Sequence, residues 1–325
     1  MNPLVSIITP CYNGEGKVNI FLDSVLKQTY DNIEFIIIND GSTDNTEEII
    51  LSYKNKFIDK GYKFIYLKQK NLGPDSALNN GLKYFSGDYI TWPDSDDILS
   101  STSIETRVDY LEKNKNKGLV YCNVNIVDGK NIKKIIQKKE KILYDDRKKN
   151  FEDILLARWI FSGSWMIRSK FFLEINPNRN LIITGQGQNF QMLLPMAWNY
   201  DMGKINSYMY TCVNYKDSHS HKERTYKENL KRFIDMEMGL IKILKECNME
   251  EKLFCKYRKI LETEYINFRL NLNISYRKNK EAKELYHICK ERNIKLYRKN
   301  KIKYYLNLFG VYTILKKIKN KVKNE

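Results

Sequence analysis

The sequence predicts an α/β protein: a Rossmann-like domain with a mainly parallel sheet, followed by a helical C-terminal region. Over roughly the first 125 residues, short apolar segments rich in β-branched and aromatic residues alternate with segments of helical spacing. This alternation is typical of a doubly wound parallel sheet. From about Thr225 onward, charged helical patterns dominate and glycine is rare. A chain of 325 residues is long enough for one large α/β domain and a smaller appendage.

Four apolar segments predict strands that are buried on both faces of the sheet. They cover residues 5–9, 33–40, 62–67 and 88–92. Between them, the spacing of apolar residues predicts helices over 18–26, from Ser42 or Thr43 onward, and over 74–85. Ser42 or Thr43 can cap the second helix, and a Gly-Pro turn precedes the third.

The pattern after this first half is mixed. It predicts a strand, a basic stretch that can form a hairpin, and a helix over residues 118–127, 130–141 and 187–198. We expect one α/β domain over 1–220, in which 118–220 receives a second substrate, and a helical region over 221–325.

The end of the chain has the pattern of a basic amphipathic helix. Apolar residues recur at spacings of three and four, at Leu308, Val311, Leu315, Ile318 and Val322. Residues 301–325 also hold seven lysines and one glutamate. Such a helix can lie on an anionic membrane, or it can pack on the protein and expose its lysines to solvent.

Polar residues follow each of the four predicted strands. They lie at 11–14, 40–42, 71–73 and 94–97. Because ligands bind at the carboxyl ends of the strands in such sheets, these segments should line one crevice.

Three carboxylates stand within four positions, at Asp94, Asp96 and Asp97. Carboxylates this close repel one another, and a hard divalent cation such as Mg²⁺ or Mn²⁺ is the usual counter-ion. Asp94 and Asp96 are the candidate ligands, although one aspartate here could simply cap a helix. Asp40 could bind a base or ribose, or it could cap the helix that starts near Ser42.

Residues 4–110 resemble the N-terminal half of family 2 glycosyltransferases with the GT-A fold. The resemblance is carried by "VSIITPCYNGEGKVNIFLDSVLKQTYDNIEFIIINDGSTDNT" and "NLGPDSALNNGLKYFSGDYITWPDSDD". Four separate motifs occur in the expected order within these two stretches. The resemblance implies a nucleotide-sugar-binding half over 1–117 and an acceptor half over 118–220.

The resemblance also implies roles for individual residues. Pro10, Tyr12 and Asp40 would hold the uracil and ribose of a UDP-sugar, and Asn71 would line the nucleotide pocket. Asp94 and Asp96 would bind Mn²⁺ or Mg²⁺ and the diphosphate, and Asp97 would orient them. The family often has arginine where this chain has Leu78, so the nucleotide could differ from UDP, or Lys70 could replace that contact.

GT-A enzymes often add a histidine to the metal ligands. The segment "KDSHSHKERTY" offers His219, with His221 as the alternative.

The family commonly places its catalytic base in a Gly-Glu-Asp segment, and the matching stretch here has Gln188 and Asn189. An amide can orient a substrate but cannot accept its proton. Asp217 could serve instead, the donor diphosphate could assist, or the reaction could follow a different stereochemistry.

Trp165 could form an apolar platform for the acceptor sugar, or it could be a core residue. Together these features predict a metal-dependent hexosyl- or N-acetylhexosaminyltransferase. It would move a sugar from a nucleotide donor to a saccharide or lipid-linked acceptor in cell-surface polysaccharide synthesis. The alternative is a catalytically silent module that binds nucleotide sugars.

Composition bounds the location and the partners. Six cysteines without a C-x-x-C pair fit a reduced, cytoplasmic protein, and we expect no signal peptide and no membrane span. Peripheral contact with the inner face of the plasma membrane is an expectation from the basic C-terminal helix. The net charge of +17 suits anionic partners, or it reflects a general Lys and Asn bias. We expect no nucleic-acid partner, because no basic motif is interleaved with aromatic residues.

Overall fold

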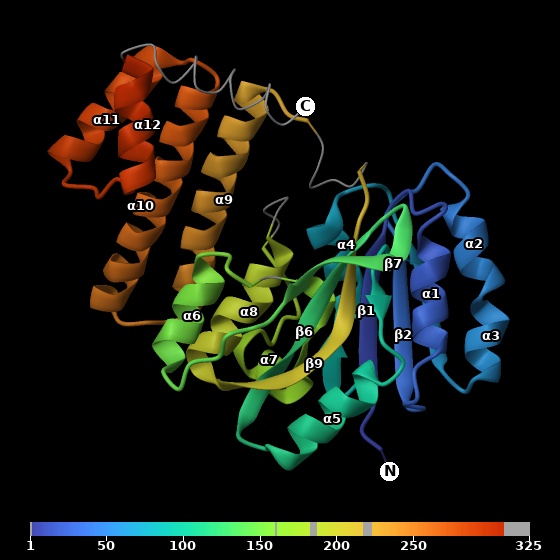
Figure 1. Ribbon diagram of the computed structural model, residues 1–325. Helices are drawn as coiled ribbons and strands as arrows, with labels where there is room; N and C mark the ends of the chain where they lie inside the picture. Colours follow the sequence, from blue (N-terminus) through green and yellow to red (C-terminus); the bar gives the residue numbers. More distant parts are fainter. Residues whose placement is uncertain (1, 160, 183–186, 217–222, 309–325) are drawn as a thin grey trace. The chain divides into compact units, whose positions relative to one another are not determined.

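The computed structural model describes residues 2–159, 161–182, 187–216 and 223–308. The chain forms two compact units, which we call unit 1 (Met1–Lys222) and unit 2 (Glu223–Glu325). In Figure 1, unit 1 runs from blue to yellow and unit 2 from gold to red.

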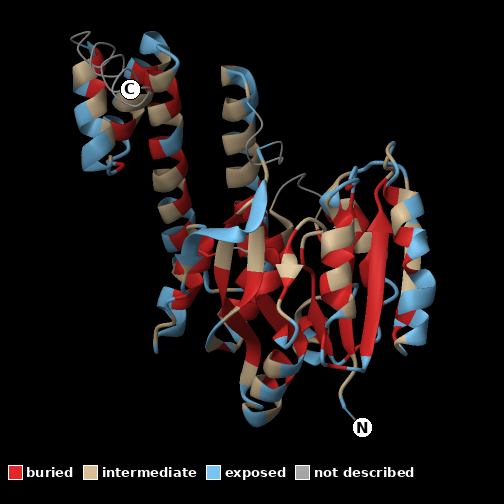
Figure 2. Cartoon of the chain, turned by 45° about the vertical axis from the view of Figure 1, so that its right-hand side comes forward, coloured by how far each residue is buried: buried red, intermediate tan, exposed pale blue. Residues whose placement is uncertain are grey.

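The first half of unit 1 is built on a parallel sheet. Strands β1 (Val5–Cys11), β2 (Ile33–Asn39), β3 (Lys63–Lys68) and β4 (Tyr89–Thr91) pair in the order β3-β2-β1-β4. All three pairings in this order are parallel. Every residue of β2 is buried, which explains its nearly continuous apolar sequence (Figure 2, red).

Helices connect these strands. They are α1 (Val18–Leu26), α2 (Thr46–Ser52), α3 (Lys54–Asp59) and α4 (Pro74–Leu82), and α5 (Ser103–Lys113) follows the last strand. One expected boundary is wrong: α2 begins at Thr46 and not near Ser42. The hydroxyl of Ser42 accepts a hydrogen bond from the Asn13 amide (3.0 Å), so this residue joins two loops and does not cap the helix.

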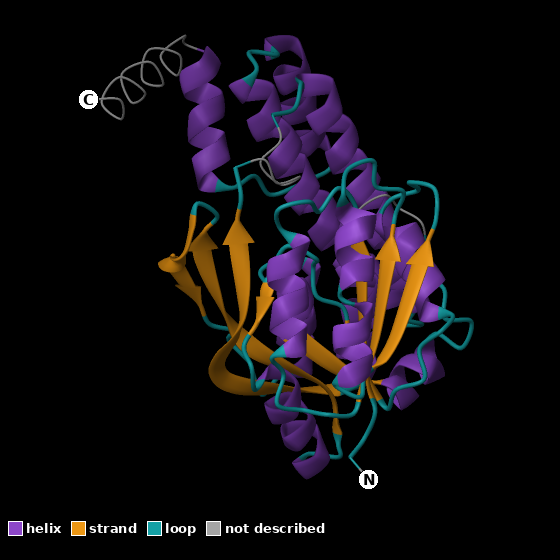
Figure 3. Ribbon diagram, turned by 90° about the vertical axis from the view of Figure 1, so that its right-hand side faces the viewer, coloured by secondary structure: helices purple, strands orange, loops and turns teal. Residues whose placement is uncertain are grey.

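The second half of unit 1 extends the sheet with mixed pairings. It comprises β5 (Ile98–Leu99), β6 (Lys117–Asp128), β7 (Asn131–Lys139), β8 (Trp165–Arg168) and β9 (Asp201–Asn214). The sheet order is β3-β2-β1-β4-β8-β6-β9-β5, and β7 pairs with β6. Strand β6 is parallel to β9 and antiparallel to β7 and β8. The other elements are α6 (Arg147–Leu155), η1 (Ser162–Ser164), α7 (Ser169–Ile175) and α8 (Gln188–Asn199). Figure 3 shows the strands of this sheet in orange and the helices in purple. The predicted α/β class, the strand at 118–127 and the helix at 187–198 are confirmed. The basic stretch is not a hairpin by itself but forms one strand, β7, which pairs with β6.

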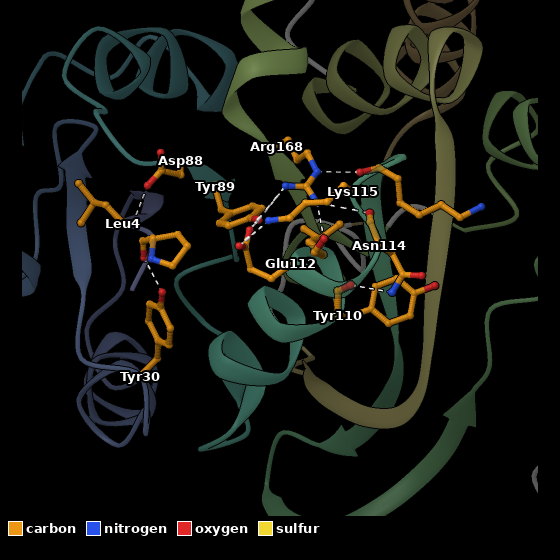
Figure 4. Close-up of polar contacts among 12 residues, drawn as sticks. Leu4, Tyr30, Asp88, Tyr89, Tyr110, Glu112, Asn114, Lys115 and Arg168 are labelled. Carbon is orange, nitrogen blue, oxygen red and sulfur yellow. Dashed lines mark hydrogen bonds and ion pairs between the residues drawn. The ribbon is translucent and has the colours of Figure 1, made fainter. Parts of the chain in front are cut away.

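Arg168 holds the amino-terminal end of β4 against α5. Its guanidinium donates to the Tyr89 hydroxyl (2.8 Å) and to the carbonyl oxygens of Lys117 (3.0 Å) and Leu111. Tyr89 in turn donates to Glu112, as Figure 4 shows. This network lies at the start of β4, whereas the candidate site residues follow its other end.

Unit 2 is helical, as predicted. It contains α9 (Tyr226–Glu246), α10 (Glu251–Ser275), α11 (Asn279–Glu291) and α12 (Arg298–Leu308). Thr225 caps α9 in a capping box with Glu228. Helix α10 packs against the other three helices, and Leu270, Ile274, Ala282 and Tyr304 form one of its apolar clusters.

Among the described residues, no helix is both long enough and apolar enough to span a bilayer. The basic amphipathic helix predicted at the end of the chain lies mostly outside the described residues, which stop at Leu308.

Candidate active site

Two loops at the carboxyl ends of β1 and β2 are joined by reciprocal hydrogen bonds. The Asn13 amide donates to the Ser42 hydroxyl (3.0 Å), and the Thr43 amide donates to Asn13 Oδ1 (2.9 Å). Asn13 adopts a positive φ of 47°, a conformation that asparagine tolerates better than most residues. The predicted segments 11–14 and 40–42 therefore meet at one edge of the sheet.

Asp40 is buried, and its carboxylate holds the loop that follows β3. It accepts hydrogen bonds from Gln69 Nε2 (2.8 Å), the Leu72 amide (3.0 Å) and the Gly73 amide (2.9 Å). A carboxylate offers about four lone-pair positions, and these bonds use three of them. The alternative that Asp40 caps a helix starting near Ser42 is wrong, because its partners Gln69, Leu72 and Gly73 lie between β3 and α4.

Gly41 lets this loop come close. Its φ is +71°, and a Cβ at this position would lie 2.6 Å from the backbone nitrogen of Asn71. Only glycine fits both the conformation and the contact. Asn71 is exposed at this edge, and Tyr12 is also exposed (49 %), whereas Pro10 is half-buried.

The acidic segment follows β4 at the same edge. Asp94 and Asp96 are half-buried and Asp97 is buried. The Asp97 carboxylate accepts hydrogen bonds from the Tyr210 hydroxyl (2.5 Å) and the Val213 amide (2.8 Å), both in β9. Asp97 therefore fixes this segment to the second half of the domain and has no oxygen aimed solely at a ligand.

Burial and mutual repulsion raise the pKa values of these acids. Burial and then the neighbouring Asp96 raise the pKa of Asp94 to about 7, although a hydrogen bond from Ser162 opposes the shift. Burial, Asp94 and Asp96 raise the pKa of Asp97 well above its ordinary value, against the hydrogen bonds from Tyr210 and Val213. Carboxylates with this excess of negative charge are a fitting place for a cation.

The donor set suits a hard divalent ion only in part. Asp94 and Asp96 supply two oxygen ligands of the kind that Mg²⁺ and Mn²⁺ prefer. The described residues contain no group of three or more His, Cys, Asp or Glu side chains placed to hold a metal. The candidates His219 and His221 and the alternative base Asp217 lie outside the described residues.

Asn189 is held in a buried hydrogen-bond chain next to the acidic segment. Its Oδ1 accepts from Trp92 Nε1 (2.8 Å), and its Nδ2 donates to the Ser162 hydroxyl (2.9 Å). Both ends of the amide are therefore occupied, which makes Asn189 a positioning residue. Gln188 is the half-buried first residue of α8.

Two sequence expectations about side-chain environment are settled by burial. Trp165 is fully buried and meets Trp92 edge-on at 4.8 Å between ring centroids, so the expected acceptor platform is wrong. Leu78 is also buried, in α4, and does not reach a ligand surface. A sugar cannot stack on a ring that presents no face to solvent.

The sequence reasoning missed Ser162, Tyr210 and Arg107. The Arg107 guanidinium is buried and donates to the carbonyl oxygens of Gly163 (3.0 Å) and Trp165 (3.0 Å), which ties η1 and the start of β8 to α5. These residues lie 27 to 113 positions from the partners named here, so no local motif could identify them. Burial lowers the pKa of Arg107.

Comparisons with known proteins agree with this geometry. The family model described as glycosyl transferase family 2 matches residues 6–174. An uncharacterized glycosyltransferase of Rickettsia prowazekii is 45 % identical over 130 residues, which cover 40 % of this chain and 39 % of that protein. The glycosyltransferase GlyA of Streptococcus pneumoniae serotype 4 is 34 % identical over 133 residues, which cover 37 % of this chain and 18 % of GlyA. This chain thus spans well under half the length of these relatives.

Solved structures share the fold along most of the chain. Residues 1–349 of S. aureus TarS, in complex with UDP-GlcNAc, superpose with a TM-score of 0.61 at 15 % identity and cover 97 % of this chain and 92 % of that one. The mannosyltransferase PcManGT of Pyrobaculum calidifontis, in complex with GDP-Man and Mn²⁺, gives a TM-score of 0.53 at 15 % identity, covering 99 % and 88 %. The expected GT-A fold is confirmed. The family model matches more than half of the chain, and the sheet edge within that part gathers Asp40, Asn71 and Asp94. This chain is therefore a glycosyltransferase of family 2.

Proposed function

We propose that the protein transfers a sugar from a nucleotide-diphosphate donor, with UDP-sugars as the first candidates, to a saccharide or lipid-linked acceptor in cell-surface polysaccharide synthesis. The observation that carries the proposal is the shared edge of the sheet, where Asp40, the Asn71 loop and the acidic segment meet. TarS, which shares the fold, was solved with UDP-GlcNAc, and this supports a nucleotide-sugar donor.

In this proposal the residues of β1 to β4 bind the donor. Tyr12 and Pro10 contact the base, Asp40 accepts a hydrogen bond from the base or ribose, and Asn71 lines the same wall. Asp94 and Asp96 would hold Mn²⁺ or Mg²⁺, and His219 would complete the ligands. When bound, the ion supplies positive charge to the departing diphosphate.

Asn189 and Gln188 orient groups in the acceptor half and do not remove a proton. Asn189 keeps Trp92 and Ser162 in place, and Ser162 donates to Asp94, so the chain from α8 to the acidic segment fixes Asp94 relative to an incoming acceptor. Asp217 is the proposed source of the base.

The test is Asp96→Asn in the full chain, with Asp59→Asn as a matched control on exposed helix α3. We expect the Asp96 variant to lose turnover of UDP-sugars by about 100-fold or more without losing stability, because it removes a ligand of the ion that would supply positive charge to the diphosphate. The control should keep full activity. Undiminished turnover in the Asp96 variant, or in excess EDTA, would contradict the metal role.

A silent nucleotide-sugar-binding module is the second candidate. It is motivated by the amide of Asn189 and the buried Leu78, which replace an acid and a basic residue of the family pattern. A binder would show thermal stabilisation by UDP without release of UDP from a panel of UDP-sugars and acceptors, whereas an enzyme would release it.

We also propose that the protein associates with the inner face of the plasma membrane. The lysine-rich sequence of residues 301–325 supports this location.

A further inference from the structure

Strand β7 exposes both apolar and basic side chains. All of its residues from Asn131 to Lys138 are exposed, so it is pale blue in Figure 2. Ile132, Ile135, Ile136 and the nearby Ile142 are 39 %, 49 %, 46 % and 63 % exposed. Single exposed isoleucines are ordinary, but four within eleven residues make this exposed segment unusually apolar. Because successive side chains of a strand point to opposite faces, these isoleucines are divided between the two faces of the hairpin.

Lysines surround these isoleucines. Residues 130–142 contain six lysines and one glutamate. Lys141 is buried in an ion pair with Asp153 (3.4 Å) and does not contribute to the surface. The other five are Lys130, Lys133, Lys134, Lys138 and Lys139. We call these five lysines and the four isoleucines the hairpin surface.

The form of the strand disfavours a second copy of the chain as its partner. Strand β7 pairs with β6 on one side, and the pairing contains register shifts near Val127. Bulges and lysines on an edge strand both discourage pairing with another strand. Five lysines on each copy would also repel one another.

Charge complementarity favours an anionic lipid bilayer. Lysine side chains can lay their methylene groups along apolar surface while their ammonium groups reach phosphate headgroups. Exposed isoleucines can enter the boundary between headgroups and acyl chains. Tyr208 of β9 lies beside this surface, because Lys138 Nζ is 5.1 Å from the centroid of its ring.

The hairpin surface is joined directly to the candidate active site. Val127 of β6 pairs with Val213 of β9, and the Val213 amide donates to Asp97 (2.8 Å). A bilayer held at β7 would therefore lie next to the strands that fix the acidic segment. This is where a lipid-linked acceptor would need to arrive.

We propose that the hairpin surface docks the protein on an anionic phospholipid bilayer. The inference rests on the proposed membrane location, but it assigns the contact to β7 and to named residues, separately from the C-terminal helix. It is tested without donor or turnover, so its failure would leave the proposed transfer reaction untouched.

The experiment compares flotation of the full chain with vesicles of phosphatidylcholine, with or without phosphatidylglycerol. One variant carries Lys133→Gln, Lys134→Gln and Lys138→Gln, and a second carries Ile132→Asn, Ile135→Asn and Ile136→Asn. The matched charge control carries Lys54→Gln, Lys56→Gln and Lys83→Gln, all exposed in unit 1. The matched apolar control is Ile58→Asn, which is 50 % exposed on α3.

We expect the lysine variant to lose partitioning into anionic vesicles on the order of 100-fold, because each lysine near such a surface contributes about fivefold. The isoleucine variant should lose about tenfold, and both controls should bind as the wild type does. Unchanged binding of both hairpin variants would overturn the proposal and assign the contact elsewhere. An equal loss in the charge control would also overturn it, because the effect would then be one of net charge. If light scattering showed that the wild type is a dimer and that the hairpin variants are monomers, the proposal would be overturned. The partner of the hairpin surface would then be a second copy of the chain.

Discussion

At the scale of single residues, Asp94 links the candidate site to stability. Burial and Asp96 raise its pKa from the ordinary 3.8 to about 7. Between these values the folded protein holds a proton that the unfolded chain releases. Its contribution to the free energy of unfolding is therefore full below about pH 4 and falls as pH rises toward 7, by at most about 1.4 kcal/mol per pH unit.

We expect Asp94→Asn to remove this loss of stability with rising pH. In metal-free buffer the variant should be more stable than the wild type at pH 8 and similar to it near pH 4, as measured by urea unfolding across pH. Mn²⁺ should stabilise the wild type at pH 8 more than it stabilises the variant. If the free energies of unfolding of the two proteins changed in parallel with pH, the raised pKa of Asp94 would be contradicted.

At the scale of secondary-structure elements, Arg168 is expected to contribute to stability and not to donor binding. It ties β8 to β4 and α5 through Tyr89 and the carbonyl oxygens of Lys117 and Leu111. Arg168→Ala removes the side-chain donor that joins these carbonyl groups to β8 and should lower the free energy of unfolding by about 2–4 kcal/mol.

Lys115→Ala is the matched control, because Lys115 contacts the same Glu112 (2.6 Å) but its side chain is 67 % exposed. A surface ion pair of this kind contributes about 1 kcal/mol or less. UDP affinity, measured by calorimetry at a temperature where both variants are folded, should be unchanged in each. Similar stability losses for the two variants would argue against this role of Arg168.

The elements also show what the sequence could predict. Strands β1 and β2 were predictable because burial on both faces requires consecutive apolar residues, as in Phe35 to Ile38. The start of α2 could not be predicted, because Ser42 could cap a helix or bind another loop. Only the tertiary contact with Asn13 decides between these two roles. Trp165 was ambiguous for a similar reason, because a tryptophan in a short aromatic segment can be core or surface. The contact of Asp97 with Tyr210 joins residues 113 positions apart, and nothing local announces it.

At the scale of the whole molecule, the two units have separate cores. The predicted donor-binding residues from Pro10 to Asp96 and the entire nine-stranded sheet lie in unit 1. Unit 2 has its own apolar clusters around α10. Units with separate cores can fold alone.

We therefore expect a fragment of residues 1–222 to unfold cooperatively and to bind UDP with an affinity close to that of the full chain. Circular dichroism melting and calorimetric titration would test this. A fragment that aggregates or lacks a melting transition would show that unit 1 needs unit 2. A folded fragment that no longer binds UDP would show that unit 2 contributes to donor binding.

Asp40 fixes the loop after β3 before any ligand binds. It does so through the three hydrogen bonds that it accepts from the Gln69 side chain and the Leu72 and Gly73 amides. That loop gives up its conformational entropy when the domain folds and not when a nucleotide arrives. The arriving molecule meets a preorganised wall, so more of the gross contact energy is retained as affinity. Slow amide exchange at Leu72 and Gly73 in the free protein would be the signature of a recognition surface built in advance.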